Sequence, residues 1–132
     1  MEVPIPELPV RTLHDQGAVL DELAVRAVER AIEDMRGRLA QSLTVEDMAR
    51  VALFSKFHFS RVFHRHTGVS PARFLSTLRF AEAKRLLATT TLNIADISAR
   101  VGYRSPGTFS ARFKTRVGAS PTQYRQSARG HR

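Results

Sequence analysis

The feature that most constrains the fold is an internal repeat, in which residues 55–71 return as residues 105–121. The two segments carry aromatic, hydroxyl, glycine and proline residues in the same register. The matched pairs are Phe59 and Phe109, Ser60 and Ser110, Phe63 and Phe113, Gly68 and Gly118, Ser70 and Ser120, and Pro71 and Pro121. A repeat with this period indicates that one supersecondary unit is duplicated. The chain should therefore contain the same structural unit twice.

Each copy of the repeat predicts a helix that is apolar on one side only. In the first copy Ser55 is a candidate N-cap and Gly68 is a helix-stop signal. The apolar side consists of Phe59, Val62 and Phe63. The opposite face, about 100° wide, presents Phe57, Ser60, Arg61 and His64. Such a helix packs by one side and offers a ring, a hydroxyl, a guanidinium and an imidazole on the other.

A shorter helix precedes each copy. In the first unit Thr44 and Asp47 have the spacing of a capping box, with aspartate in place of glutamate. Residues 92–99 repeat the pattern of residues 43–50, with Asn93 in the place of Thr44. Two short helices joined by a tight turn, the second with a basic polar face, are typical of a helix-turn-helix motif.

These patterns predict an all-α fold of about seven helices, with two helix-turn-helix subdomains joined by a long linker helix. The expected segments are an extended proline-rich arm at 1–14, an N-terminal helix at 15–41, the first helix-turn-helix at 42–69, the linker helix at 70–90, the second helix-turn-helix with a short C-terminal helix at 91–126, and a basic, frayed tail at 127–132. The linker helix should span roughly 27 Å. The N-terminal helix could brace the domain or contact a second chain, and its mixed apolar pattern favours the brace.

Charge divides the chain into two parts. Residues 1–41 hold five arginines and eight acidic residues, whereas residues 42–132 hold sixteen lysines or arginines and four acidic residues. A concentrated positive field favours a polyanion such as nucleic acid, or an anionic membrane face. No apolar run approaches the roughly 18 residues that span a bilayer, and the N-terminus lacks the features of a signal peptide. We therefore expect no membrane association.

Several classes of chemistry find no support in the residues. Cysteine is absent, which excludes disulfides, thiolate nucleophiles and cysteine-based zinc sites, and which suits the cytoplasm. No pair among His58, His64 and His66 has the i, i+4 spacing for one metal ion. No carboxylate pair, phosphate loop or Ser/His/Asp arrangement stands out. We expect no enzyme activity, no metal and no cofactor.

The repeated motifs resemble those of a known family. The relevant stretches are Leu43-Thr44-Val45-Glu46-Asp47-Met48-Ala49, Phe59-Ser60-Arg61-Val62-Phe63, Thr67-Gly68-Val69-Ser70-Pro71, Leu78-Arg79-Phe80-Ala81-Glu82-Ala83-Lys84-Arg85-Leu86-Leu87, Val101-Gly102-Tyr103 and Gly118-Ala119-Ser120-Pro121. Over about residues 28–126 the chain resembles the DNA-binding domain of AraC/XylS-type transcription regulators. The resemblance implies a sequence-specific regulator of bacterial transcription that places the second helix of each unit in the major groove of double-stranded DNA. The residues do not distinguish activation from repression, and activation is taken as the expectation.

The resemblance also implies where bases are read. In the first unit the base-facing positions fall on Phe57, Ser60 and Arg61, and Arg61 can pair with guanine O6 and N7. In the second unit they fall on Gly107, Ser110 and Ala111. There the arginine has moved one place on, to Arg112, which rotates it about 100° from the reading face. We expect the first unit to specify sequence and the second to position the protein.

Backbone phosphates would be bound by helix N-termini and by basic side chains, among them Lys114 on the face of the second unit. The expected contacts are Ser55, Lys56, Arg65, Arg104, Ser105, Arg112, Lys114 and Arg116. Together they should make binding steeply salt-dependent.

Two further questions stay open at this stage. The alternative function is a general basic architectural DNA-binding protein without strong sequence preference; the weak second reading face favours it and the ordered duplication argues against it. The other question concerns partners. Most AraC-like regulators carry an effector or dimerisation domain, and 132 residues leave no room for one. The chain could therefore be a stand-alone regulator or a piece of a longer one. A monomer on DNA is favoured over a dimer, with RNA polymerase as a further expected partner.

Overall fold

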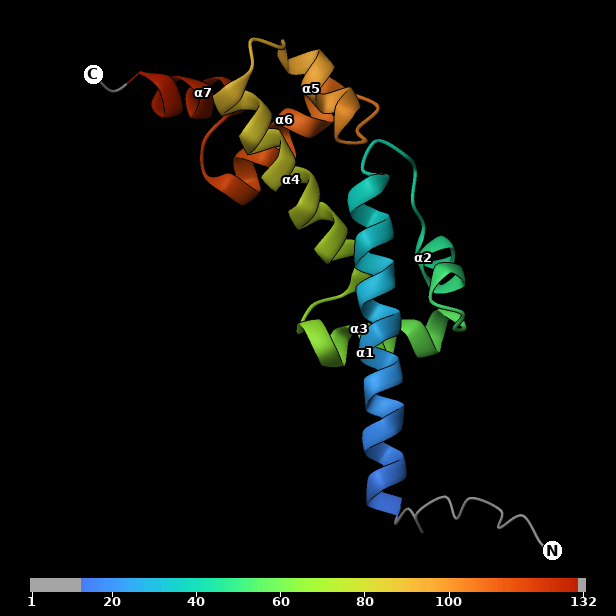
Figure 1. The fold of residues 1–132 in the computed structure, drawn as a ribbon. Helices are drawn as coiled ribbons and strands as arrows, with labels where there is room; N and C mark the ends of the chain where they lie inside the picture. The colour runs from blue at the N-terminus through green and yellow to red at the C-terminus, as the bar shows by residue number, and fades with distance from the viewer. Residues whose placement is uncertain (1–12, 131–132) are drawn as a thin grey trace, which may run out of the picture.

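Seven α-helices make up residues 13–130, the part of the chain that the computed structural model describes, and no β-strand occurs there. They are α1 (Leu13–Gly37), α2 (Val45–Val51), α3 (Lys56–Thr67), α4 (Pro71–Thr89), α5 (Ile94–Arg100), α6 (Pro106–Val117) and α7 (Pro121–Arg129). In Figure 1, α2 and α3 lie beside α1, and α4 runs obliquely from them to a group formed by α5, α6 and α7. The predicted all-α fold, with two helix-turn-helix units joined by a long helix, is confirmed.

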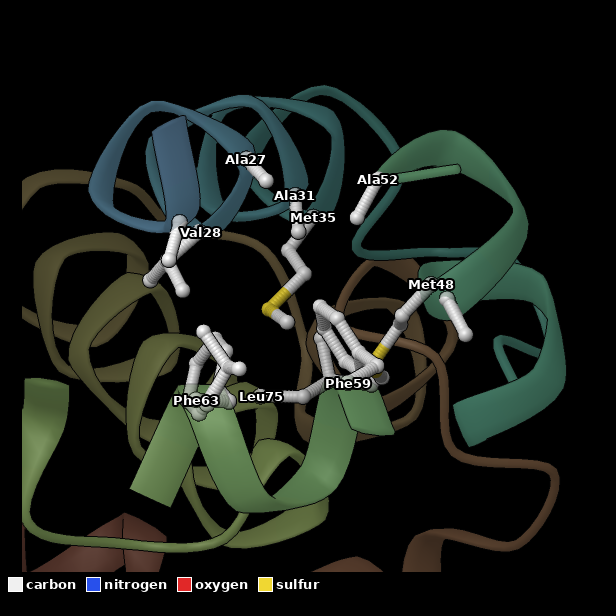
Figure 2. Close-up of a cluster of buried hydrophobic side chains, with 12 residues drawn as sticks. Ala27, Val28, Ala31, Met35, Met48, Ala52, Phe59, Phe63 and Leu75 are labelled. Atoms are coloured by element: carbon white, nitrogen blue, oxygen red, sulfur yellow. The ribbon is translucent and has the colours of Figure 1, made fainter. Parts of the chain in front are cut away.

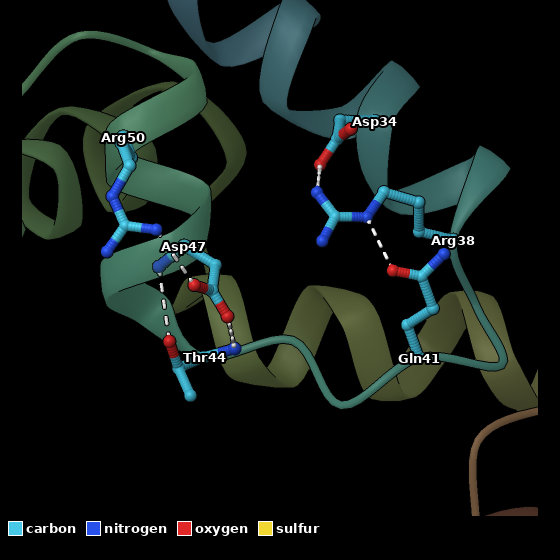
Figure 3. Close-up of polar contacts among 6 residues, drawn as sticks. All are labelled: Asp34, Arg38, Gln41, Thr44, Asp47 and Arg50. Carbon is cyan, nitrogen blue, oxygen red and sulfur yellow. Dashed lines mark hydrogen bonds and ion pairs between the residues drawn. The ribbon is translucent and has the colours of Figure 1, made fainter.

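Polar caps fix where the short helices begin. The Asp47 amide donates to Thr44 Oγ1 at 3.1 Å, and the Thr44 amide donates to the Asp47 carboxylate at 3.0 Å (Figure 3). This is the capping box that the sequence predicts. Ser55 and Ser105 cap α3 and α6 by accepting backbone amides of those helices at 3.3 Å. Caps of this kind contribute about 1 kcal/mol each.

The core of the first unit lies between α1, α2, α3 and the start of α4. Figure 2 shows Met35 of α1 pointing toward the rings of Phe59 and Phe63, with Met48 of α2 beside Phe59. None of these side chains is more than 2% exposed. The N-terminal helix therefore supports α2 and α3, in agreement with the brace interpretation. Farther toward its N-terminus, Leu20 and Leu23 are exposed.

A second core lies between the later part of α4 and the helices α5, α6 and α7. Phe109 and Phe113 of α6 are fully buried here, with ring centroids 5.6 Å apart. Phe80 of α4 contacts both rings, at 6.4 and 5.9 Å. Since Leu75 of the same helix belongs to the first core, α4 contributes to both units.

The duplication extends further than the sequence pattern indicates, because α1 takes part in it. Arg79 of α4 donates from Nε to the Leu39 carbonyl at 3.1 Å and from Nη2 to the Gln41 carbonyl at 2.7 Å. Both carbonyls lie in the connection between α1 and α2, shortly after α1 ends at Gly37. Arg79 therefore fastens α4 to the segment after α1, a contact that the sequence pattern does not indicate.

The second unit contains the same fastening, made by Arg129 of α7. Its Nε donates to the Ala88 carbonyl at 3.3 Å, and its Nη2 donates to the Thr90 carbonyl. Donors and acceptors both match those of the first unit at the offset of the repeat. The segment at the end of α1 thus supplies the carbonyl acceptors for the first unit, and the end of α4 supplies them for the second. We call each of these arrangements an arginine clamp.

Three predicted boundaries differ from the structure. Helix α1 begins at Leu13 and ends at Gly37, whereas the sequence predicts 15–41. The chain turns at Arg38, whose guanidinium binds the side chains of Asp34 and Gln41, both at 3.0 Å (Figure 3). Helix α7 continues to Arg129, although a frayed tail was expected from 127, because its last arginine forms the second clamp. The predicted arm lies outside the described residues except at positions 13 and 14, which are helical, and residues 131–132 lie outside them too.

Candidate nucleic-acid interface

Helix α3 turns a chemically mixed face away from the first core. Phe59, Val62 and Phe63 are at most 3% exposed, so the helix is held firmly by one side. On the opposite side Phe57 is 76% exposed, and Arg61 is exposed as well. Phe57 therefore contributes an exposed apolar ring to this face, beside the charged guanidinium of Arg61.

A groove of about 660 Å³ runs beside this face. Its lining comes from three helices and consists of Val45, Ser60, Arg61, His64, Arg65, Ser70, Pro71 and Ala72. The last three residues form the N-terminal end of α4, where the helix dipole is positive. Arginine side chains and a helix N-terminus therefore border one open groove, an arrangement that suits an anion.

Two of the expected phosphate contacts on α3 have partners within the chain. Lys56 Nζ lies 2.8 Å from Glu46 Oε1, and the hydrogen bond from Lys56 is the main cause that lowers the pKa of Glu46. Arg65 lies 3.7 Å from Asp21 of α1. Each of the four side chains is about half exposed or more. Exposed pairs of this kind are weak, so both cations remain able to exchange partners.

The equivalent face of α6 carries fewer kinds of functional group. Gly107 and Ala111 are exposed, and Ser110 is partly buried. Phe109 and Phe113 fix the helix on its core in the same way as in the first unit. The two faces are thus equivalent in position but not in chemistry, since the guanidinium of Arg61 has a methyl group as its counterpart in α6.

The basic residues of the second unit fall into two groups. Arg104, Lys114 and Arg112 are exposed, and Arg112 borders a groove of about 290 Å³ between α6 and α4. Arg116 instead binds α4. Its guanidinium donates to Ser76 Oγ at 3.3 Å and to Thr77 Oγ1 at 3.1 Å, and its Cζ lies 5.4 Å from the centroid of the Phe80 ring.

The histidines and the long helices bear on metal binding and on membrane insertion. The His58 ring stacks on Phe54, with centroids 4.6 Å apart and planes 18° apart. Within residues 13–130 no group of three His, Cys, Asp or Glu side chains could hold a metal ion. No described helix combines the length and the apolar character needed to cross a membrane.

Sequence reasoning missed two features of this surface. The first is His64, which was placed on the polar face but given no role, and which lines the groove with Arg61. The second is Leu53, which is 83% exposed in the turn before α3 and holds a φ of 62°. The signal for the first was its spacing of three residues from Arg61. For the second, the signal was its alignment with Gly102 in the second copy.

Comparison with known proteins agrees with this geometry. A family model described as a helix-turn-helix domain matches residues 48–127. The HTH-type transcriptional activator AarP of Providencia stuartii is 33% identical over 97 residues, which cover 74% of this chain and 72% of AarP. The lactose operon transcription activator of Staphylococcus xylosus is 32% identical over 98 residues, which cover 74% of this chain and 35% of that protein.

Among solved structures, the DNA-binding domain of the global transcriptional factor AdpA, in complex with a target DNA, has a TM-score of 0.76 and 31% identity. The match covers 80% of this chain and 96% of that domain. Fold and matches together define a DNA-binding helix-turn-helix transcription regulator. The chain belongs to the AraC/XylS family. It spans most of the length of AarP but only 28% to 36% of other matched regulators.

Proposed function

We propose that the chain binds double-stranded DNA by placing α3 and α6 in two successive segments of the major groove. The observation that carries this proposal is the exposed face of α3, where Phe57 and Arg61 project from a helix whose other side is fully buried. Major-groove segments on one side of DNA lie about 34 Å apart. The 19 residues of α4 give a rod of roughly 28 Å, which suits that separation once the offsets of the two helices are added.

In the first unit, Arg61 is proposed to read guanine through O6 and N7, a bidentate pair that discriminates by about 1–3 kcal/mol. Phe57 would contact thymine methyl groups or sugar edges, and its high exposure supports a role outside the core. Ser60 would add a weakly specific hydrogen bond. The face of α6, with Gly107, Ser110 and Ala111, would fit the groove without strong discrimination.

Backbone phosphates would be bound around these faces. The proposed contacts are the N-terminal ends of α3 and α6 at Ser55 and Ser105, together with Lys56, Arg65, Arg104, Arg112 and Lys114. The groove beside Arg61 is well placed for a backbone phosphate of the bound DNA, because arginine side chains and the α4 N-terminus border it. Arg116 is left out, since its guanidinium already binds α4.

Selection from a pool of randomised duplexes tests the proposal. We expect enrichment of a site with two half-sites, of which the half bound by α3 carries the greater information. Orientation is assigned by hydroxyl-radical footprints of the wild-type chain and the Arg61→Ala variant. Absence of any enriched site would refute sequence-specific binding. Equal information in the two half-sites would refute the asymmetry between the units.

The biological setting follows from the family. A regulator that binds the bacterial chromosome acts in the cytoplasm, and we propose that location for this chain. The similarity to AarP and to the lactose operon activator supports activation, with RNA polymerase as the partner. Because one chain carries two reading units, a monomer is sufficient to occupy one site.

A further inference from the structure

Besides sharing α4, the two units touch where the second unit meets the segment that follows α1. Gly102, in the turn between α5 and α6, lies against the Leu39 carbonyl and the guanidinium of Arg79. A Cβ atom at position 102 would lie 2.7 Å from Arg79 Nη2 and 2.8 Å from its Cζ, closer than real Cβ contacts. Figure 1 shows this turn beside the C-terminal end of α1. The second unit therefore rests directly on the clamp of the first.

The clamp of the first unit is made by a charged side chain that bridges distant segments of the chain. Arg79 joins α4 to carbonyl groups 38 and 40 residues earlier in the chain. Arg79 is partly buried, and this burial lowers the pKa of its guanidinium below its ordinary value. The group stays charged, as arginine does in proteins, and charged donors make the stronger hydrogen bonds.

The first unit shows that the turn itself does not require glycine. Leu53 occupies the position equivalent to Gly102, and each turn has the same pair of backbone hydrogen bonds. Both residues have positive φ, 62° for Leu53 and 87° for Gly102. The leucine side chain is accommodated because it points into solvent. At position 102 the same side chain would collide with the clamp, so glycine there marks an interface between the units.

Two separated attachments restrict how the units can move. A single helix between them permits bending and twisting, whereas the contact of Gly102 with the Leu39 carbonyl adds a second attachment that restricts both motions. We propose that Arg79 and Gly102 are positioning residues that set the spacing and rotation at which α3 and α6 meet DNA, and hence the half-site spacing that the protein accepts. The inference rests on the proposed function, since it concerns two heads on one duplex.

The test uses the full chain and the site enriched by the wild type. Duplexes are prepared with one base pair inserted or removed between the half-sites, which shifts one half-site by about 3.4 Å and rotates it by about 34°. Affinities are measured by fluorescence anisotropy. For the wild type we expect binding to the shifted sites to be weaker by about tenfold, a difference of about 1.4 kcal/mol. We call the affinity for the original site divided by that for a shifted site the spacing ratio. For Arg79→Lys and Gly102→Ala we expect the spacing ratio to fall to about threefold or less.

Matched controls separate positioning from simple loss of stability. Arg129→Lys weakens the equivalent clamp in the second unit, whose acceptors are the Ala88 and Thr90 carbonyls and do not include the Leu39 carbonyl that Gly102 contacts. Gly118→Ala introduces the same backbone strain, since Gly118 has a φ of 96° and open space around its Cα. Both controls should retain the wild-type ratio, even where thermal unfolding shows that they are destabilised.

The outcomes are distinct. Loss of the spacing ratio in both junction variants, with the controls unchanged, supports the inference. Should Gly102→Ala fail to fold, Arg79→Lys decides alone. If the junction variants keep the wild-type ratio, or if the controls lose it equally, the inference is refuted while sequence-specific binding stands. A wild type that binds all spacings equally also refutes it, and a selection without any enriched site refutes the proposed function as well.

Discussion

Thr44 and Asp47 exchange two hydrogen bonds at the start of α2, each through its own backbone amide and the other's side chain. The second carboxylate oxygen of Asp47 accepts from Arg50 Nη1 at 3.2 Å. The two contacts made to the carboxylate, from the Thr44 amide and from Arg50, favour its ionised form. The pKa of Asp47 is accordingly lowered, chiefly by the bond from the Thr44 amide. The first helix of the first unit therefore begins at a group whose contribution depends on pH.

We expect Asp47→Asn to lower the free energy of unfolding near neutral pH. Since the folded-state pKa of Asp47 lies below its unfolded value, the stabilisation is complete above the unfolded pKa of about 3.9 and is lost as pH falls through the folded pKa. Urea unfolding of the wild type and of Asp47→Asn should show a difference in the free energy of unfolding that is smaller in acid than at neutral pH. A difference that is constant with pH would contradict the assignment.

Leu53→Gly should stabilise the protein. A left-handed conformation costs a leucine roughly 1–2 kcal/mol, and the higher entropy of glycine in the unfolded chain offsets part of the gain. Little packing is lost because the side chain is almost fully exposed. The net effect should be an increase of up to about 1 kcal/mol in denaturant unfolding. The reverse change, Gly102→Leu, should destabilise strongly, and a destabilised Leu53→Gly would show that the leucine makes a contact that matters for folding.

Arg61→Ala should relax specificity at one base pair of the selected site and weaken binding there by about 1–3 kcal/mol. Binding to duplexes that already lack the guanine should change little. Arg65→Ala is the matched comparison, because Arg65 lies on the same helix but is assigned to phosphate. It should weaken binding to all sequences alike and lower the salt slope by about 1. Identical binding profiles for the two variants would contradict the separate roles.

On α6, substitutions of Arg116 and Lys114 should also have different effects, the first on stability and the second on DNA binding. Arg116→Ala removes two hydrogen bonds and a cation–π contact with Phe80, so we expect unfolding to become easier by about 1–2 kcal/mol. The salt slope of DNA binding should hardly change. Lys114→Ala should show the opposite result, with unchanged stability and a salt slope lower by about 1. A reduced salt slope for Arg116→Ala would restore this residue to the phosphate contacts.

Much of this fold is predictable from sequence because its determinants are local. Caps such as Thr44 and Ser55 act within one helical turn, and the positive φ of Gly68 ends α3 where the pattern indicates. The buried positions of Phe59 and Phe109 follow from helical periodicity alone. The repeated register of these signals supports the helix-turn-helix interpretation twice over.

What the sequence did not predict depends on contacts between distant segments. Helical periodicity does not indicate the contacts of Arg79, since it considers only the helix on which a residue lies, and the partners of Arg79 belong to the segment after α1. For the same reason the pattern does not indicate that Arg116 binds α4 or that Arg129 binds the end of α4. The roles of Phe57, Arg61 and Ala111 on DNA remain predictions, since they depend on a partner that the chain does not contain.

Helix α4 closes the first unit with one arginine clamp and opens the second by offering its own C-terminal carbonyls to the next. A helix that supplies both the arginine of one clamp and the carbonyl acceptors of the next can connect further units. Helix α7 supplies only the arginine of a clamp. Extending it with residues 80–89 and appending a further copy of residues 90–129 would supply the carbonyl acceptors, another helix-turn-helix and another clamp. The architecture thus lends itself to engineered regulators with three heads, whose binding sites grow by one groove segment for each added unit.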